Sequence, residues 1–310
     1  MEKRRRVAEE YLGTQKMDKS VLSKLASLAC NIFKDELLSK HCSFKIGGPA
    51  DCFIEISNEE ALSLFLKNIG NDDFYILGGG TNVLFSDDGY RGIVISLTGK
   101  FKEIVASGEE IFCGGGALLS NVLNTAVKNN LIGLEFVSGI PGSVGGAVCG
   151  NAGLRDKWID SVIKTIGVYR DAKKMSVERK QIAFSYRKSN LENSIISDVC
   201  FSLKKTVEND NLAAAFESMQ KRLKTQPLNF PNAGSVFKNP EGRSVGKLIE
   251  EAGLKGVRVG GAQISEIHGN FIVNTGMASA KNVLTLIGLI EEKIYKRFNI
   301  KLEMEIKIIK

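Results

Sequence analysis

The stretch SGIPGSVGGAVCGNAG, from Ser138 to Gly153, holds six glycines in sixteen positions, one proline and no charged residue. Glycine accepts positive φ and leaves backbone N–H groups uncovered, so a glycine turn can surround a phosphate without any side chain. Three further clusters precede it: IGGPAD (46–51), LGGGTNVL (77–84) and CGGGA (113–117). A single cluster is more often a tight turn, but four clusters in the first half of the chain favour a large phosphate-bearing ligand.

The usual nucleotide-binding motifs are missing from the sequence. A Walker loop requires Ser or Thr after its Gly-Lys pair, whereas Phe101 and Leu248 follow the two Gly-Lys pairs of this chain. No G-x-G-x-x-G fingerprint opens a helix, and the expected elements do not form repeated βαβ units. We therefore expect a nucleotide-like ligand that is held by a different scheme.

Composition indicates a soluble protein of more than one domain. At 310 residues the chain exceeds what one hydrophobic core usually supports, and 43% apolar with 25% charged residues is ordinary for globular proteins. The start, MEKRRRVAEEYLG, lacks the apolar core of a secretory signal, and no apolar run approaches the roughly 18 residues that cross a bilayer. These features predict a cytoplasmic protein without membrane association.

Neither a metal nor a nucleic acid is expected as a partner. The chain has two histidines and six scattered cysteines without a C-x-x-C pair, so we expect reduced thiols that fill the core. About half of the net charge of +7 lies in the first six residues, and no basic stripe is interleaved with aromatic side chains. The remaining positive charge suits a small polyanionic ligand.

The spacing of apolar residues predicts an α+β alternation of helices and strands. Leu22, Leu25, Leu28, Ile32 and Leu37 recur at roughly helical intervals and predict that residues 1–40 are helical. Ser57 and Glu60 form a capping-box pattern ahead of a helix over 61–69. Further helices are expected at 119–127, 209–224, 242–256 (closed by Gly256) and 280–298, and strands at 52–56, 74–77, 93–97, 110–116, 161–170, 197–205, 270–274 and 301–309.

Six blocks of the chain, taken in order, resemble one enzyme family. They are HCSFKIGGPAD (41–51), ILGGGTNVLFSDDGYRGIVI (76–95), LEFVSGIPGSVGGAVCGNAG (134–153), FSYRKSN (184–190), PNAGSVFKNP (231–240) and LEMEI (302–306). The family is that of the UDP-N-acetylenolpyruvoylglucosamine reductases, flavoenzymes that complete UDP-N-acetylmuramic acid in bacterial wall synthesis. Six ordered blocks are far more specific than any one of them, and the resemblance runs from about residue 40 to the C-terminus.

The resemblance implies an α+β fold with a two-domain FAD-binding unit of the vanillyl-alcohol-oxidase/PCMH type and a C-terminal α+β substrate domain. We accordingly expect an N-terminal helical segment (1–40), two FAD-binding subdomains (41–98 and 99–208) and a substrate-binding domain (209–310). FAD is expected to bind non-covalently, with its diphosphate against two walls: Gly78, Gly79, Gly80, Thr81 and Asn82 form the first, and Gly142, Ser143, Gly145, Gly146, Asn151 and Ala152 the second. The segment GLRDKW (153–158) departs from the relatives and leaves contacts beyond Ala152 open.

The implied reaction uses NADPH to reduce the flavin, after which a hydride passes to the enolpyruvyl methylene carbon of UDP-N-acetylglucosamine enolpyruvate. The resulting enolate has to be held and then protonated. By the resemblance, Arg187 binds the substrate carboxylate, Ser235 donates the proton and Glu305 supports the enolate. Strand periodicity puts Glu303 on the same face as Glu305, so only the resemblance chooses between them.

The resemblance also predicts contacts to the UDP-sugar, from Tyr186, Lys224, Lys238, Asn239 and His268, with Asn270 as a further candidate. The interval between Arg187 and Ser235 leaves little room for an extra capping segment found in one branch of the family, so we expect the shorter branch, and a monomer. Two alternatives stay open. One is an FAD oxidoreductase of the same fold type with another substrate, and the other is a non-catalytic nucleotide-binding protein.

Overall fold

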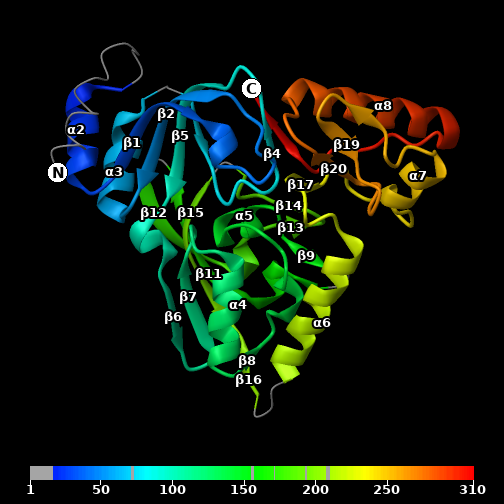
Figure 1. Ribbon diagram of the computed structural model, residues 1–310. Coiled ribbons are helices and arrows are strands. Elements are labelled where there is room, and N and C mark those ends of the chain that lie inside the picture. Colours follow the sequence, from blue (N-terminus) through cyan, green and yellow to red (C-terminus); the bar gives the residue numbers. More distant parts are fainter. Residues whose placement is uncertain (1–16, 71–72, 155–156, 171, 193, 207–209) are drawn as a thin grey trace. The chain divides into compact units, whose positions relative to one another are not determined.

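A computed structural model describes residues 17–70, 73–154, 157–170, 172–192, 194–206 and 210–310. The chain divides into two units (Figure 1). Unit 1 comprises the described residues of Met1–Glu36, Asp51–Gly79 and Gly92–Gln220, and unit 2 comprises Leu37–Ala50, Gly80–Arg91 and Lys221–Lys310. The division expected from the sequence followed chain order, whereas each unit draws on three separate segments.

One sheet of unit 1 has four strands in the order β1 (Asn31–Leu37), β2 (Pro49–Ile56), β5 (Tyr90–Leu97) and β3 (Phe74–Ile76). Helices α2 (Lys19–Ser27) and α3 (Glu59–Asn68) share a hydrophobic core with it, to which Leu25, Ile54 and Phe65 contribute. Helix α3 lies near the predicted 61–69, but its N-cap is one residue later than the capping-box pattern predicted. Asn58, not Ser57, is its N-cap and accepts a hydrogen bond from the N–H of Ala61.

The prediction of a helix over residues 1–40 is wrong for the part after Ser27. Helix α2 ends there, Ala29 takes a left-handed φ of 63°, and β1 follows. Leu22 and Leu25 do lie on the buried side of α2, but Ile32 packs into the core as a strand residue. Pairing with β2 therefore overrides the weak helical spacing of the later residues. Residues 1–16 of that prediction lie outside the described residues.

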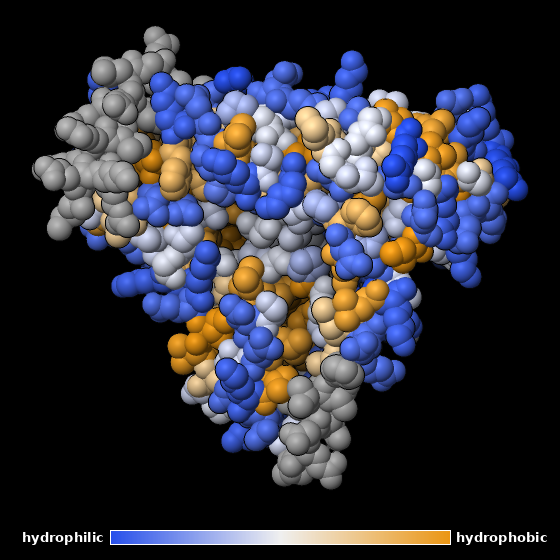
Figure 2. All heavy atoms as spheres, in the orientation of Figure 1, coloured by the Kyte–Doolittle hydropathy of each residue, from blue (hydrophilic) through white to orange (hydrophobic). Residues whose placement is uncertain are grey.

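The second sheet of unit 1 is antiparallel, in the order β12 (Lys173–Glu178), β11 (Ile163–Arg170), β15 (Ile195–Ser202), β7 (Glu110–Gly114) and β6 (Ile104–Ser107). Helices α4 (Leu119–Lys128) and α5 (Val144–Cys149) bury their apolar residues in one core with β7, β11 and β15 (Figure 1). Figure 2 shows apolar residues among polar ones over the part that carries β6 and β7, where the exposed side chains of the register partners Val105 and Phe112 lie.

Short strands and one helix complete the regular structure up to residue 225. The strands are β8 (Leu131–Ile132), β9 (Gly153–Leu154), β10 (Lys157–Trp158), β13 (Phe184–Ser185), β14 (Lys188–Ser189) and β16 (Lys204–Lys205). They form three pairs, β9 with β10, β13 with β14 and β8 with β16. Helix α6 (Asp210–Thr225) follows, close to the predicted 209–224, of which residue 209 lies outside the described residues.

Unit 2 is built on an antiparallel sheet in the order β17 (Asn232–Ser235), β20 (Phe271–Asn274), β19 (Ala262–Ile264) and β18 (Arg258–Val259). Helix α8 (Ala280–Phe298) packs on β18 and β19 and confirms the predicted range 280–298. Its buried residues include Val283, Leu286, Ile287, Ile290 and Ile294, the apolar face expected from the sequence. A further pair, β4 (Val83–Phe85) with β21 (Lys307–Ile309), is parallel.

Two predicted elements of unit 2 are shorter than expected. Helix α7 (Val245–Glu251) ends before Gly253, whose φ is 73°, so Gly256 does not close it. The strand predicted over 301–309 is regular only at β21, because the chain changes partner on the way. Met304 forms an isolated bridge with Phe237, and only after Ile306 does the chain join β4.

Candidate functional site

The two predicted glycine walls meet inside unit 1. A Cβ on Gly79 would lie 2.6 Å from Cα of Gly142, and one on Gly78 would lie 2.5 Å from Oγ of Ser143. The main chains therefore approach closely enough to exclude side chains at both positions. Gly80, the next residue, belongs to unit 2, where its φ is 64° and a Cβ would overlap the carbonyl of His41.

Helix α5 begins in the second wall. Ser143 is its N-cap, and its Oγ accepts a hydrogen bond of 3.3 Å from the N–H of Gly146. Gly145 is fixed by packing, since a Cβ there would lie 3.1 Å from the carbonyl oxygen of Gly115. At Gly146 a Cβ would meet only Oγ of Ser143, at 3.4 Å, so contacts within the chain do not explain the glycine. This position fits a ligand that lies directly against the backbone.

The other two glycine clusters are explained by packing within the chain. A Cβ on Gly48 would overlap the carbonyl of Asp87, and Cβ atoms on Gly115 and Gly116 would overlap the carbonyls of Ile196 and Leu97. The clusters at 46–51 and 113–117 therefore do not support the phosphate hypothesis. Packing within the chain also accounts for Gly78, Gly79 and Gly80, so the hypothesis depends on the second wall, where Gly146 is open. Counting glycines in the sequence cannot separate these two causes.

Asn151 and Ala152, at the end of the second wall, carry hydrogen bonds that join segments of unit 1. Asn151 is 4% exposed; its Nδ2 donates to the carbonyl of Ser185 at 3.2 Å, and its Oδ1 accepts from the N–H of Asp160 at 3.3 Å. The N–H of Ala152 donates to the carbonyl of Ala147 at 2.8 Å, and the carbonyl of Ala152 accepts the N–H of Ile159 at 2.8 Å. Asn151 thereby connects the end of α5 to the β13–β14 hairpin.

Tyr186 and Arg187 form the two-residue turn of that hairpin, and Arg187 has a left-handed φ of 57°. The guanidinium carbon of Arg187 lies 5.5 Å from the ring centre of Trp158 and 5.9 Å from that of Tyr186. The two rings meet edge to face, with centres 5.5 Å apart. Sequence analysis missed Trp158; the available signals were that it is the only tryptophan of the chain and that it ends the departing segment GLRDKW, of which residues 155–156 lie outside the described part.

Unit 2 brings the segment after β17 alongside the C-terminal segment. The carbonyl of Val236 accepts hydrogen bonds from the N–H groups of Glu305, at 2.8 Å, and Ile306, at 3.3 Å. The N–H of Lys238 donates to the carbonyl of Glu303 at 2.8 Å. Ser235, at the end of β17, therefore lies on the segment next to the one that carries Glu305. Gly234 precedes it with a φ of 77°, near the carbonyl oxygen of Thr81.

The structure distinguishes the two glutamates that periodicity left equivalent. The side chain of Glu303 is 73% exposed and its Oε1 lies 2.6 Å from Nζ of Lys238. Glu305 is half-buried, and its carbonyl accepts a hydrogen bond of 3.0 Å from Nδ2 of Asn82. The carbonyl of Asn82 in turn accepts the N–H of Lys307 at 3.1 Å. Asn82, predicted to contact the cofactor, thus holds the Glu305 segment within unit 2.

Asn270 fixes the Ser235 segment from its other side. It is 3% exposed, its Nδ2 donates to the carbonyl of Phe237 at 2.7 Å, and its Oδ1 accepts the N–H of Phe237 at 3.0 Å. Its own carbonyl accepts the N–H of Val236 at 2.9 Å. One side chain thus pairs both main-chain groups of a buried residue.

The remaining predicted substrate contacts differ in their surroundings. Oδ1 of Asn239 accepts the N–H of Val245 at the start of α7, 3.0 Å away, and Lys224 is exposed on α6. Nδ1 of His268 accepts the N–H of Asn270 at 3.2 Å, and its ring packs edge to face on Phe271. Burial lowers the pKa of His268, and nearby Lys255 lowers it further. These contacts favour a structural role for His268 and Asn239.

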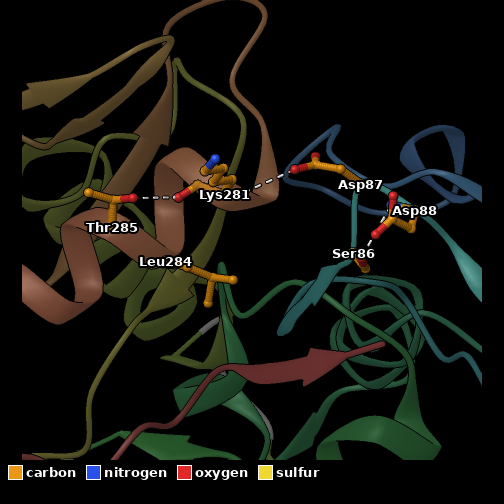
Figure 3. A pocket seen from close by; sticks show the side chains of 6 residues that line it. All are labelled: Ser86, Asp87, Asp88, Lys281, Leu284 and Thr285. Atoms are coloured by element: carbon orange, nitrogen blue, oxygen red, sulfur yellow. Dashed lines mark hydrogen bonds between the residues drawn. The ribbon is translucent and has the colours of Figure 1, made fainter.

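A cavity of about 550 Å³ lies in unit 2 away from all these residues. Figure 3 shows Ser86, Asp87 and Asp88 on one side and Lys281, Leu284 and Thr285 of α8 on the other. Asp87 accepts hydrogen bonds from the N–H groups of Ala280 and Lys281, at 2.7 and 3.0 Å, and so caps α8. This polar group of the cavity lining is therefore already paired with the start of α8.

All six cysteines are free thiols, five of them buried, as the sequence predicted. Burial raises the pKa of Cys200 to about 11, so its thiol stays protonated at neutral pH.

Within the described ranges, no group of three or more His, Cys, Asp or Glu side chains could hold a metal ion. No helix among the described residues is both long and apolar enough to cross a membrane.

Comparisons with known proteins relate both parts of the chain to one enzyme family. A family model described as UDP-N-acetylenolpyruvoylglucosamine reductase, C-terminal domain, matches residues 226–309, and an FAD binding domain model matches residues 50–163. The chain is 41% identical to UDP-N-acetylenolpyruvoylglucosamine reductase 2 of Symbiobacterium thermophilum over 282 residues, 89% of this chain and 92% of the relative. It is 40% identical to the reductase of Carboxydothermus hydrogenoformans over 300 residues, 94% of this chain and 99% of the relative.

The crystal structure of the reductase from Thermus caldophilus superposes with a TM-score of 0.80 at 35% identity, over 91% of this chain and 99% of that one. These matches confirm the predicted combination of an FAD-binding fold with the C-terminal domain of the reductases. The chain belongs to the UDP-N-acetylenolpyruvoylglucosamine reductases, a family of FAD-binding oxidoreductases.

Proposed function

We propose that this protein reduces UDP-N-acetylglucosamine enolpyruvate to UDP-N-acetylmuramate with NADPH, as a monomer in the cytoplasm. The observation that carries the proposal is the pairing of two segments of unit 2, which puts a serine hydroxyl and a half-buried carboxyl on neighbouring stretches of chain. A hydroxyl and a carboxyl are the groups required to protonate and stabilise an enolate. Glu303 forms an ion pair with Lys238, which supports Glu305 as the carboxyl that stabilises the enolate.

The glycine walls of unit 1 suit the FAD diphosphate. Gly78 and Gly79 with Ser143 and Gly146 offer backbone amides and one small hydroxyl, and the open position at Gly146 leaves room for phosphate oxygens. When bound, FAD supplies the hydride carrier between NADPH and the enolpyruvyl methylene carbon. Asn82, Asn151 and Ala152 are proposed to support the site indirectly, because each joins chain segments through the hydrogen bonds described above.

Arg187 is proposed to bind the substrate carboxylate. A guanidinium is permanently charged and planar, so it holds a carboxylate through two parallel N–H donors. Its positive charge also stabilises the enolate, in which electron density from the former carbon–carbon double bond has moved onto the carboxylate. Tyr186 beside it, together with Lys224 and Lys238, is proposed to contact the remainder of the UDP-sugar.

Ser235 is proposed to donate the proton that completes the product. Its Oγ–H bond breaks as a new C–H bond forms at the carbon next to the carboxylate. A hydroxyl is a weak acid, so this transfer requires a strongly basic carbon and a positively charged neighbour such as Lys238, while Glu305 supports the enolate through a hydrogen bond. The left-handed Gly234 and the pairing with residues 303–306 fix the backbone that presents the hydroxyl.

The deciding experiment is an assay of the purified protein with and without the enolpyruvyl substrate. We expect a yellow protein that consumes NADPH only when UDP-N-acetylglucosamine enolpyruvate is present, with UDP-N-acetylmuramate as the product by mass spectrometry. A yellow protein that oxidises NADPH without forming this product would favour a flavin oxidoreductase with another substrate. A colourless protein that takes up no FAD would favour non-catalytic nucleotide binding.

A further inference from the structure

We propose that Trp158 is a positioning residue for Arg187: with Tyr186 it holds the guanidinium through cation–π contacts and aligns it for the carboxylate of the enolpyruvyl substrate. The inference rests on the proposed function of Arg187, and it assigns a task to the departing segment GLRDKW. Trp158 itself acts through Arg187 and need not touch the substrate.

The hairpin that carries Arg187 cannot orient this side chain by itself. Its strands β13 and β14 have two residues each, and the side chain stems from a backbone with a φ of 57°. Residues with a Cβ adopt this region rarely, and such exceptions gather at functional sites. Arginine also has several rotatable bonds, so the contacts along its length decide where the guanidinium lies.

The aromatic rings provide that contact without using the donors of the guanidinium. The guanidinium carbon lies 5.5 Å from the ring centre of Trp158 and 5.9 Å from that of Tyr186, both within the range of a cation–π interaction. A cation–π contact is not a hydrogen bond, so it does not occupy the N–H donors of the guanidinium. These donors therefore stay available for a carboxylate.

The segment that pairs with Trp158 leaves room for the indole ring. Trp158 pairs with Gly153, and a Cβ on Gly153 would lie 2.4 Å from the carbonyl oxygen of Lys157 and 2.5 Å from Cε3 of Trp158. Glycine at the end of the motif SGIPGSVGGAVCGNAG thus makes room for both the paired strand and the indole ring. The amide of Asn151, two residues earlier, holds the carbonyl of Ser185 at the base of the hairpin. The same motif thus seats the ring and anchors the arginine turn.

The exposure of the rings also favours a positioning role. Tyr186 is 43% exposed and Trp158 is half-buried, although large aromatic side chains that serve only to fill a core are usually buried. The edge-to-face contact between the rings, at 86°, fixes the indole from its open side. The arrangement is therefore built around a cation at the surface of unit 1.

The test compares two ligands that differ in the enolpyruvyl carboxylate, with the oxidised holoenzyme and no NADPH. Isothermal titration calorimetry measures the Kd of UDP-N-acetylglucosamine enolpyruvate and of UDP-N-acetylglucosamine. For Trp158→Leu we expect the first Kd to rise roughly 10-fold, the scale of a lost cation–π contact, and the second to change less than about 2-fold. Trp158→Phe, which restores an aromatic face, should recover most of the affinity.

The matched control is Phe298→Leu, which removes a ring 5.4 Å from both Arg243 and Arg297 in unit 2 and should leave both Kd values unchanged. In turnover, Trp158→Leu should lower kcat/KM for the enolpyruvyl substrate by about 10-fold or more, while KM for NADPH stays close to wild type. Because Trp158 is the only tryptophan, its fluorescence in the wild-type protein should change on saturation with the enolpyruvyl ligand even if a variant fails to fold.

Equal weakening of both ligands by Trp158→Leu would overturn the inference, because a merely structural role affects the whole site. Unchanged affinity for both ligands, or a wild-type tryptophan emission that ignores the enolpyruvyl ligand, would also overturn it. Failure of the proposed function looks different: the wild-type holoenzyme would then neither bind nor turn over the enolpyruvyl substrate.

Discussion

The turn at Tyr186–Arg187 in unit 1 and the segment Ser235–Lys238 in unit 2 are held in opposite ways. The turn connects strands of two residues, and the position of its cation depends on the rings of Trp158 and Tyr186. The second segment is held by its main chain, which pairs with residues 303–306 on one side and with Asn270 on the other.

The difference follows from the length of the side chains that are presented. The hydroxyl oxygen of a serine lies one bond beyond Cβ, so a fixed backbone limits it to three staggered positions. An arginine cation lies several rotatable bonds away, so a fixed backbone leaves it free to move unless something holds its far end. We therefore expect unit 1 to respond to single side-chain changes and unit 2 to changes in main-chain pairing.

The largest effect is expected from Ser235→Ala. Loss of the proton donor should lower kcat for the enolpyruvyl substrate by about 100-fold or more, because one acid–base group commonly contributes that much. NADPH oxidation with ferricyanide as electron acceptor should stay near the wild-type rate, since it requires no proton from Ser235. Ser202→Ala, an exposed serine of β15, is the control. Equal slowing of both reactions would mean that the serine has another role.

Two buried asparagines, Asn270 and Asn151, give a direct comparison of the regions. Asn270→Ala leaves the N–H and carbonyl of buried Phe237 without partners, and should lower the free energy of unfolding by about 2–4 kcal/mol. Asn151→Gly, with glycine chosen because φ is 41°, should lower it by about 1 kcal/mol. Its bonds are longer, at 3.2 and 3.3 Å, and water can replace it at the exposed Ser185.

Chemical denaturation of both variants measures these changes, and activity separates their consequences. Asn270→Ala should also reduce kcat, because the Ser235 segment loses its fixed position. Asn151→Gly should mainly raise KM for the enolpyruvyl substrate, through the hairpin of Arg187. The reverse order of stabilities would mean that main-chain pairing is not what holds the second region.

Glu305→Gln and Glu303→Gln test whether the irregular C-terminal segment assigns the acting carboxyl. We expect kcat to fall about 10- to 100-fold for Glu305→Gln. For Glu303→Gln the expected change is less than about 3-fold, because the Glu303 side chain is 73% exposed and solvent weakens its ion pair with Lys238. Steady-state assays of the two purified variants measure both, and a larger loss from Glu303→Gln would transfer the role to that residue.

Local patterns in the sequence were sufficient wherever one element buries one face. Helix α8 follows its apolar spacing from Ala280 to Phe298, and β20 lies within the predicted strand at 270–274. Residues 31–37 became a strand because tertiary pairing with β2 outweighed a weak helical spacing. The C-terminal segment departed from strict alternation because it exchanges one partner, residues 236–238, for another, β4.

The site shows the same limit. Glu303 and Glu305 share a face in any regular strand, and only the irregular pairing of the segment makes one of them exposed. Trp158 lies 29 positions from Arg187 in the chain, so no local pattern joins them. Glycine counting gave the right ligand class for a partly wrong reason, since the glycines at 48, 115 and 116 avoid the chain itself.

The smallest expected effect is a pH-dependent loss of stability caused by His268. Burial lowers its pKa, Lys255 lowers it further, and Glu250 and a backbone hydrogen bond raise it only in part. The unfolded chain, with a pKa near about 6.5, then binds the proton more readily than the folded chain. The contribution of neutral His268 is complete above about pH 6.5 and is lost as pH falls through the lowered folded pKa.

In His268→Asn the side-chain oxygen can still accept the N–H of Asn270, but no titrating group remains. Between pH 7.5 and pH 5, thermal unfolding followed by circular dichroism should therefore show a drop in Tm that is about 2–4 °C larger for the wild type than for the variant. Parallel curves for the two proteins would assign the acid sensitivity of unit 2 to other groups, and would leave the ring of His268 with the packing role that Gly246 and Phe271 already indicate.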